Sequence, residues 1–252
     1  MASTTLIQIN TNHARRAQDL LLHTLAECGG GIALISEPFN IPDKHPNWMS
    51  DPAGSVAIFW LGNDNACNPI TSGTGWTAAK WRNIIVMATY LPPSINLEDM
   101  ETSLEEISDF IKRTPATPIL LGGDFNAKSP EWGCKFWDQK GRLLADWASG
   151  LGLLLVNRGD VNTCVAWRGE STVDITWANY SAVKHVCNWR VWEELETLSD
   201  HRYVGMIIST SGNRTTDARK TVTKEVGTTE IKYGFTHDGP GVCNMARRYP
   251  CG

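Results

Sequence analysis

A carboxylate and a carboxamide stand two residues apart in the stretch Gly122-Gly123-Asp124-Phe125-Asn126. An aspartate can hold a hard metal ion or take up a proton, and an asparagine can donate a hydrogen bond to an anion without changing its own charge. This pairing suits the hydrolysis of a phosphate ester. The alternative is ordinary turn chemistry, because Gly, Asp and Asn all favour tight turns.

Other polar residues follow, or stand beside, the ends of further expected strands. They are Asn10, Glu37, Tyr90, Asp174, Asp200 and His201. Loop residues at one rim of a layered α/β protein commonly form its site, so we expect these side chains to meet there. Each has a plainer interpretation as a solvated, packed or capping residue. Asp174 is harder to explain in that way, because a buried carboxylate without a partner is costly and a partner such as His201 would offset the cost.

Apolar patterns predict the elements that must position these residues. The expected strands cover residues 6–10, 32–36, 55–60, 81–90, 119–121, 153–156, 163–167, 171–177, 185–192 and 203–209. Helical spacing predicts helices over 12–28, 97–111 and around 143–148, the first of them capped by Asn12. Residues 62–80 are rich in Gly, Asn, Thr and Ser and indicate a turn or hairpin. Helices and strands mixed in this way indicate a layered α/β domain.

Composition narrows the class of protein. The chain has 252 residues with 42% hydrophobic and 20% charged content, which fits an ordinary globular protein. Its longest apolar runs fall short of the roughly 18 residues typical of a membrane span, and we expect no membrane association. The seven cysteines form no C-x-x-C pair, so we interpret them as reduced thiols of an intracellular protein. A net charge of -4 argues against strong nonspecific binding of nucleic acid.

The composition changes near Thr210. Beyond it the chain is rich in Thr, Gly, Arg and Lys and shows little periodicity. We therefore predict one domain over residues 1–210, followed by a linker or poorly ordered tail over 211–252.

Two motifs point to a family. Gly-Gly-Asp-Phe-Asn-Ala at 122–127 and Ser-Asp-His at 199–201 resemble the endonuclease/exonuclease/phosphatase superfamily. The extended form, Gly-Asp-Phe-Asn-Ala-Lys-Ser-Pro-Glu-Trp-Gly, resembles the apurinic-endonuclease-like endonuclease domain of non-LTR retrotransposons. The resemblance spans roughly residues 4–209. It implies a deoxyribonuclease-I-like, four-layered α/β sandwich, in which two packed mixed β-sheets are flanked by helices.

The resemblance also implies an activity. It suggests a Mg²⁺-dependent DNA endonuclease, with Mn²⁺ as the alternative ion, that nicks a strand of double-stranded DNA and leaves a 3′-hydroxyl, as in target-primed retrotransposition. Glu37 would bind the metal and Asp200 would lie near it, because Mg²⁺ prefers oxygen ligands. Asp124 would orient and deprotonate the attacking water.

The remaining residues would act on the phosphate. Asn126, Asn10 and Tyr90 would hold the scissile phosphate or its developing charge. His201 would contact a phosphoryl oxygen, with Asp174 fixing its tautomer and favouring its charged form.

Contacts with DNA are harder to assign. Lys128, Trp132 and Arg190 lie in or near loops beside the motifs and are predicted to contact substrate. The alternative for the tryptophans is packing, since the chain contains 11 of them. We expect a nuclear protein that is a monomer in isolation.

Two other functions stay open. One is a phosphatase of the same superfamily, which the sequence Ala127-Lys128-Ser129-Pro130 makes less fitting for inositol phosphates. The other is an inactive retroelement fragment, although every expected catalytic residue is present.

Overall fold

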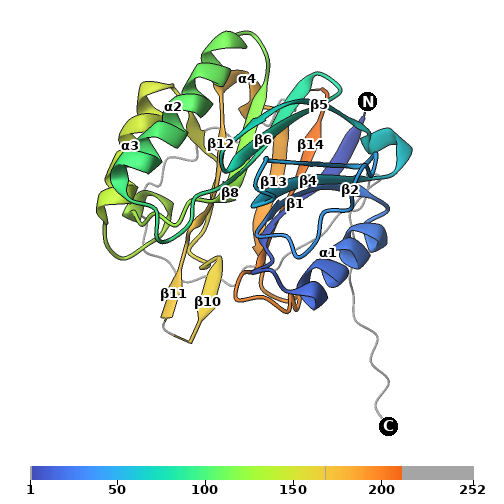
Figure 1. Ribbon diagram of the computed structural model, residues 1–252, viewed down its shortest axis with the longest axis horizontal. Coiled ribbons are helices and arrows are strands. Elements are labelled where there is room, and N and C mark those ends of the chain that lie inside the picture. Colours follow the sequence, from blue (N-terminus) through green and yellow to red (C-terminus); the bar gives the residue numbers. More distant parts are fainter. Residues whose placement is uncertain (1, 168, 212–252) are drawn as a thin grey trace, which may run out of the picture. The chain divides into compact units, whose positions relative to one another are not determined.

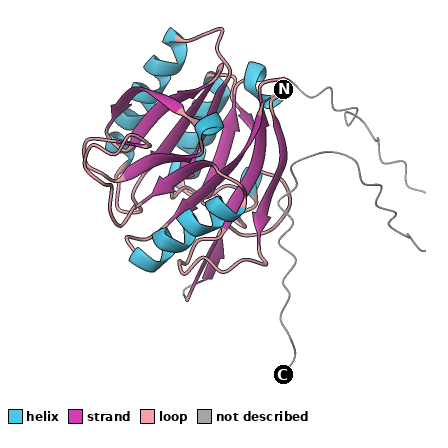
Figure 2. Ribbon diagram, turned by 90° about the vertical axis from the view of Figure 1, so that its right-hand side faces the viewer, coloured by secondary structure: helices cyan, strands magenta, loops and turns pink. Residues whose placement is uncertain are grey.

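The computed structural model describes residues 2–167 and 169–211. The linker or tail expected over 211–252 lies, beyond residue 211, outside the described residues. The described strands form two six-stranded mixed sheets and one small hairpin (Figures 1 and 2).

The first sheet has the strand order β13-β14-β1-β2-β4-β3. Its strands are β1 (Ser3–Asn10), β2 (Gly31–Ser36), β3 (Trp48–Ser50), β4 (Val56–Leu61), β13 (Val186–Trp192) and β14 (Tyr203–Ser209). The central strands β1 and β2 run parallel, so their carboxyl ends, with Asn10 opposite Ser36, reach the same edge of the sheet.

The second sheet has the order β5-β6-β7-β8-β12-β9. Its strands are β5 (Cys67–Gly73), β6 (Trp76–Trp81), β7 (Ile84–Tyr90), β8 (Ile119–Asp124), β9 (Leu154–Leu155) and β12 (Asp174–Ala178). Here β7 and β8 are the parallel pair, which sets Tyr90 beside Asp124. A separate hairpin joins β10 (Cys164–Ala166) to β11 (Gly169–Ser171).

Three helices cover the outer faces of the two sheets: α1 (Arg15–Glu27), α2 (Leu97–Arg113) and α3 (Gln139–Gly150). The short α4 (Tyr180–Val183) packs with Ala182 in the apolar cluster between the sheets. Figure 1 shows α1 beside the first sheet, with α2 and α3 on the far side of the second. Two single 3₁₀ turns, Asn63–Asn65 and Pro130–Trp132, lie in connections. None of the helices in the described residues is long and apolar enough to cross a membrane.

Three apolar clusters separate the layers. One lies between the sheets and joins Leu34 of β2 to Trp81 and Leu120 of the second sheet. The others lie under α2 and α3 and under α1. The expected four-layered α/β sandwich is therefore confirmed.

A buried glutamine crosses the apolar space between the sheets. Gln8 of β1 is fully buried, and its amide nitrogen donates to the carbonyl oxygens of Gly123 at 3.1 Å and Ile175 at 3.4 Å. Its oxygen accepts from Thr176 Oγ1 at 3.1 Å. A buried polar group needs such partners, so these bonds fix how one sheet sits against the other.

Three expectations about element limits are wrong. Asn12 does not cap α1: the cap position is Ala14, and Asn12, at φ 50°, donates its backbone N–H to Asn10 Oδ1 at 2.7 Å. The single strand expected over 81–90 is two strands, because the chain turns at Arg82, where φ is 57°.

The strand expected over 171–177 is also interrupted. β11 ends at Ser171 and β12 begins at Asp174. Between them the side chain of Thr163 replaces a neighbouring strand, because its Oγ1 accepts from the backbone N–H of Val173 at 3.2 Å and of Asp174 at 3.1 Å. This side-chain acceptor carries no periodic signal in the sequence.

Gly123 is required by the close approach of β7 to β8. Its φ is +152°, and a Cβ atom at this position would lie 1.8 Å from the Thr89 carbonyl oxygen. We expect Gly123→Ala to lower the free energy of unfolding by roughly 3 kcal/mol or more, since backbone strain and overpacking add. Urea unfolding followed by circular dichroism measures this change. Gly150→Ala is the matched control, because nothing lies within 4 Å of that position, and its stability should stay unchanged or rise.

Candidate active site

Strand register places the site at one end of the sandwich. In the second sheet Asp124 is opposite both Tyr90 and Asp174, so three of the predicted residues form one row across β7, β8 and β12. In the first sheet Asn10 ends β1 next to the end of β2, and Glu37 follows directly. Segments far apart in the chain therefore meet at one rim.

Asp124 is the centre of this group. Only 1% of it is exposed, and its Oδ2 accepts from Asn10 Nδ2 at 2.9 Å and from Asn126 Nδ2 at 3.0 Å. Its Oδ1 accepts from the backbone N–H of Asn126 at 3.0 Å. Asn126 has a left-handed φ of 46°, a conformation that asparagine tolerates better than most residues.

Asp174 and His201 form a hydrogen-bonded pair. His201 Nδ1 lies 2.8 Å from Asp174 Oδ2, and His201 Nε2 lies 3.9 Å from Asp124 Oδ2. The imidazole thus stands between two carboxylates. The loop that carries it is fixed to β1, because Ser199 Oγ donates to the Asn10 carbonyl at 2.8 Å and accepts from the His201 N–H at 3.2 Å.

Burial and charge shift the protonation of both partners. Burial, and after it the charge of Asp174, raises the pKa of Asp124 from 3.8 to about 7, although His201 and the hydrogen bonds from Asn10 and Asn126 act in the opposite direction. For His201, burial lowers the pKa, but the charge and hydrogen bond of Asp174 outweigh that effect and leave the pKa well above 6.5. The site therefore offers a carboxylate able to accept a proton near neutral pH and an imidazole that favours its charged form.

Glu37 is the more open carboxylate of the site. Its Oε2 accepts from Asn10 Nδ2 at 2.9 Å, its Oε1 lies 3.5 Å from His13 Nε2, and its side chain is 20% exposed. Its φ of 48° turns the chain sharply after β2. The hydroxyl of Tyr90 is hydrogen-bonded to Glu37, and burial followed by this bond raises the pKa of Tyr90 above its usual range.

The oxygen-rich rim has the ligand chemistry of a divalent ion. Asp124, Asp174 and His201 could hold a metal ion, since one ligand atom from each lies within 4.8 Å of the others. Asp174 Oδ1 is buried and has no hydrogen-bond partner among the described residues, which a nearby positive charge would stabilise. Carboxylate oxygens are the ligands that Mg²⁺ prefers.

Two of the predicted roles for the amides change with the structure. Both hydrogens of Asn10 Nδ2 are engaged, one by Glu37 and one by Asp124. Asn126 Nδ2 donates to Asp124 and to the Leu91 carbonyl at 3.0 Å. With these donors occupied, the two asparagines position the carboxylates, and the phosphate-holding role predicted for them lacks a free donor.

The other predicted residues lie outside this hydrogen-bonded group. Asp200 is exposed, and its backbone carbonyl accepts from Val165 at 2.7 Å. Lys128 is exposed in the loop after Asn126. Arg190 is exposed on β13, where it pairs with Glu194 at 2.9 Å and lies over the Trp192 ring.

The predicted DNA contact of Trp132 is wrong. Only 3% of this residue is exposed, its ring packs edge-on against Trp177, and its Nε1 donates to the Ala127 carbonyl at 3.0 Å. A side chain buried in this way cannot stack on a base, so packing explains Trp132.

The sequence-based prediction missed His13 and Thr163. His13 contacts Glu37, and Thr163 holds the backbone at Asp174. His13 follows Asn10 closely, so its position after a strand end was the available signal, whereas Thr163 had none.

Comparisons with known proteins agree with this geometry. The family model described as "Endonuclease-reverse transcriptase" matches residues 84–205. The "Putative 115 kDa protein in type-1 retrotransposable element R1DM" of Drosophila melanogaster is 27% identical over 84% of this chain and 22% of its own length. The chain thus spans about a fifth of that curated relative.

Solved structures share the fold. The endonuclease domain of TRAS1, a telomere-specific non-LTR retrotransposon, has a TM-score of 0.69 and 26% identity, covering 81% of this chain and 98% of that one. The 3′ phosphatase NExo from Neisseria, bound to product DNA hairpin, has a TM-score of 0.63 and 16% identity, with coverages of 82% and 99%. An AP endonuclease from Archaeoglobus fulgidus has a TM-score of 0.63 and 15% identity, with coverages of 82% and 100%.

The two-sheet sandwich, the row of polar residues at its rim and these matches define the class. The chain is similar to the endonuclease/exonuclease/phosphatase superfamily. It is similar to a protein of the type-1 retrotransposable element R1 and to the endonuclease domain of the non-LTR retrotransposon TRAS1.

Proposed function

We propose that this domain is a Mg²⁺-dependent DNA endonuclease that hydrolyses one phosphodiester bond of double-stranded DNA and leaves a 3′-hydroxyl. The observation that supports it best is the bonded group at the rim, in which buried Asp124 is held by Asn10 and Asn126 and lies 3.9 Å from the imidazole of His201. A buried carboxylate next to a charged imidazole is a costly arrangement for packing alone and a useful one for acid–base chemistry.

Each residue has a role in this proposal. Asp124, with its raised pKa, takes the proton of the attacking water. His201 donates a hydrogen bond from Nδ1–H to Asp174 and presents Nε2–H to a phosphoryl oxygen. Tyr90 donates its hydroxyl hydrogen to Glu37, so in this proposal it positions that carboxylate. Asn10 and Asn126 keep Asp124 oriented for the proton transfer.

The carboxylates would also hold the metal. Glu37, the more open of them, has carboxylate oxygens that suit Mg²⁺ or Mn²⁺, and Asp200 in its exposed loop is the further candidate. A bound divalent ion supplies charge stabilisation at phosphorus and lowers the pKa of bound water.

The biological setting is part of the proposal. A 3′-hydroxyl at a nick is the end that a reverse transcriptase extends, so the reaction suits target-primed retrotransposition. Chromosomal DNA as the substrate implies a nuclear location, and we propose that the isolated domain acts as a monomer.

Nicking of supercoiled plasmid tests the activity. We expect the protein to convert supercoiled plasmid to open circles with Mg²⁺, and to lose this activity with EDTA or in an Asp124→Ala variant. Sequencing the nick positions on a mixed DNA library would give the site preference and the chemistry of the ends. Release of phosphate from a soluble phosphoester without any nicking would indicate the phosphatase alternative instead. A folded protein without either activity would indicate an inactive fragment.

A further inference from the structure

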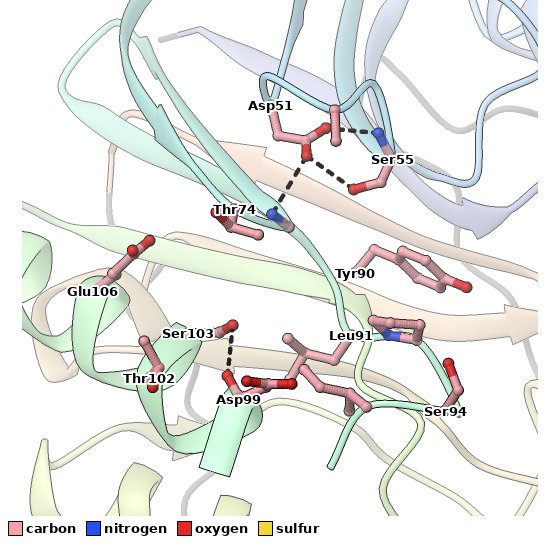
Figure 3. Close-up of a pocket in the computed structure, with 14 residues that line it drawn as sticks. Asp51, Ser55, Thr74, Tyr90, Leu91, Ser94, Asp99, Thr102, Ser103 and Glu106 are labelled. Carbon is pink, nitrogen blue, oxygen red and sulfur yellow. Dashed lines mark hydrogen bonds between the residues drawn. The ribbon is translucent and has the colours of Figure 1, made fainter. Parts of the chain in front are cut away.

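Two hollows border residues of the candidate site, one at Tyr90 and the other at Asn126. The first, of about 510 Å³, is bordered by Tyr90 and Leu91 and is drawn in Figure 3. It contains three carboxylates, Asp51, Asp99 and Glu106, and among its described lining residues there is no lysine or arginine. Such a surface repels the phosphates of a DNA strand.

The carboxylates of the first hollow are built into the fold. Asp51 is 3% exposed and accepts from Ser55 N at 2.7 Å, Val56 N at 3.0 Å and Gly75 N at 3.3 Å. Figure 3 shows Asp51 on one wall and Asp99 and Glu106 on the helix opposite. The negative charge on this side of the site is therefore fixed in place.

The second hollow borders Asn126 instead of Tyr90 and differs in charge. It has a volume of about 820 Å³ and is lined by Asn126 of the site, by Trp137, and by Lys140 and Arg142 of α3. Lys140 Nζ donates to the neutral Pro93 carbonyl at 2.7 Å, so this contact leaves its charge uncompensated. Arg142 is exposed and, in the part of the chain that the structure describes, pairs with no carboxylate.

One carboxylate also lines the second hollow. Asp138 Oδ1 accepts from Gly141 N at 2.6 Å and from Lys128 N at 3.1 Å, which caps the start of α3. Its negative charge offsets one of the two positive charges of Lys140 and Arg142, so this lining is net positive, whereas the described lining of the first hollow carries three negative charges and no positive one. Trp137, which is 39% exposed, adds an apolar surface to the same lining as Lys140 and Arg142.

We propose that the hollow of Trp137, Lys140 and Arg142 is a DNA subsite that binds the backbone of the nucleotides flanking the scissile phosphate. Lys140 and Arg142 neutralise phosphates, and Trp137 contacts a base or sugar. The inference rests on the proposed function, and it adds the side by which the strand leaves the site: past Asn126 towards α3, and away from the acidic hollow beside Tyr90.

Salt-dependent binding tests the subsite. Anisotropy of a short fluorescein-labelled DNA duplex is titrated with the full chain in EDTA, so that no cleavage intervenes. We expect a Lys140→Gln/Arg142→Gln double variant to bind about tenfold or more weakly at 0.1 M salt, and its plot of log K against log salt to be shallower by roughly two. Trp137→Ala should weaken binding without changing that slope, because stacking carries no charge.

The control has the same charge change elsewhere. Lys112→Gln/Arg113→Gln alters the exposed far end of α2, which at 17 residues is roughly 25 Å long, and should bind like the wild type. Lys140→Arg/Arg142→Lys should restore the slope. The subsite proposal is overturned if the salt slope of Lys140→Gln/Arg142→Gln is unchanged. It is also overturned if the control variant loses as much DNA affinity. Either result can occur with a wild type that still nicks plasmid. A wild type that does not nick plasmid with Mg²⁺ contradicts the proposed function itself.

Discussion

Asp124→Asn should reduce Mg²⁺-dependent nicking by roughly three orders of magnitude, because an amide cannot accept the proton of the attacking water. The substitution keeps the size of the side chain and an oxygen acceptor. It removes the negative charge of Asp124, which burial and the neighbouring charge of Asp174 already destabilise. The measurement is the rate of plasmid nicking at saturating protein.

Stability separates loss of chemistry from loss of fold in this variant. The new amide must face either the Asn126 backbone N–H or the side-chain amides of Asn10 and Asn126, all of which are donors. We expect this mismatch to lower the free energy of unfolding by about 1–3 kcal/mol, which leaves a folded protein at 25 °C. Urea unfolding measures it. Nicking at near wild-type rates by a folded Asp124→Asn protein would remove Asp124 from the proton transfer.

Asp174→Asn should reduce nicking by about 100-fold and change its dependence on pH. In the wild type the charge of Asp174 holds the pKa of His201 well above 6.5, so the imidazole stays charged at neutral pH. Without that charge, burial favours the neutral ring and the pKa falls. The alkaline limb of the rate profile should therefore move to lower pH, and NMR titration of His201 without metal should show the same change.

The raised pKa of His201 also determines how the stability of the protein changes with pH. A raised pKa in the folded state stabilises the protein fully below the unfolded-state pKa of about 6.5, and this stabilisation is lost as the pH rises through the folded-state value. The gap in stability between wild type and Asp174→Asn should therefore narrow at alkaline pH. Asp200→Asn is the matched control, because Asp200 is exposed and outside the hydrogen-bonded pair, so the His201 titration should be unaffected. An unshifted His201 titration in Asp174→Asn would show that the pair does not set the protonation of the ring.

Much of the fold could be predicted because its signals are local. Buried runs such as 32–36 and 119–121 carry strand propensity, with glycines just before the first and just after the second. The meeting of Asn10, Glu37, Asp124 and His201 could be predicted from strand ends and from the family resemblance together.

What escaped prediction depends on tertiary contacts. The break before Asp174 is made by the hydroxyl of Thr163, and the burial of Trp132 by its fit against Trp177. Neither changes the apolar pattern of the sequence around it. The occupied donors of Asn10 and Asn126 likewise emerge only when both acceptors are in place.

The cross-sheet bonds of Gln8 have a consequence for how such a domain can diversify. Asn10 comes from one half of the sandwich and Asp124 from the other, and the bonds from Gln8 to Gly123 and Ile175 lock the two halves in a single alignment. A slip of one half by a fraction of a bond length would separate the amide from the carboxylate. Loops around the candidate site are therefore free to vary with the target, whereas Gln8 and the backbone groups that it contacts tolerate little change.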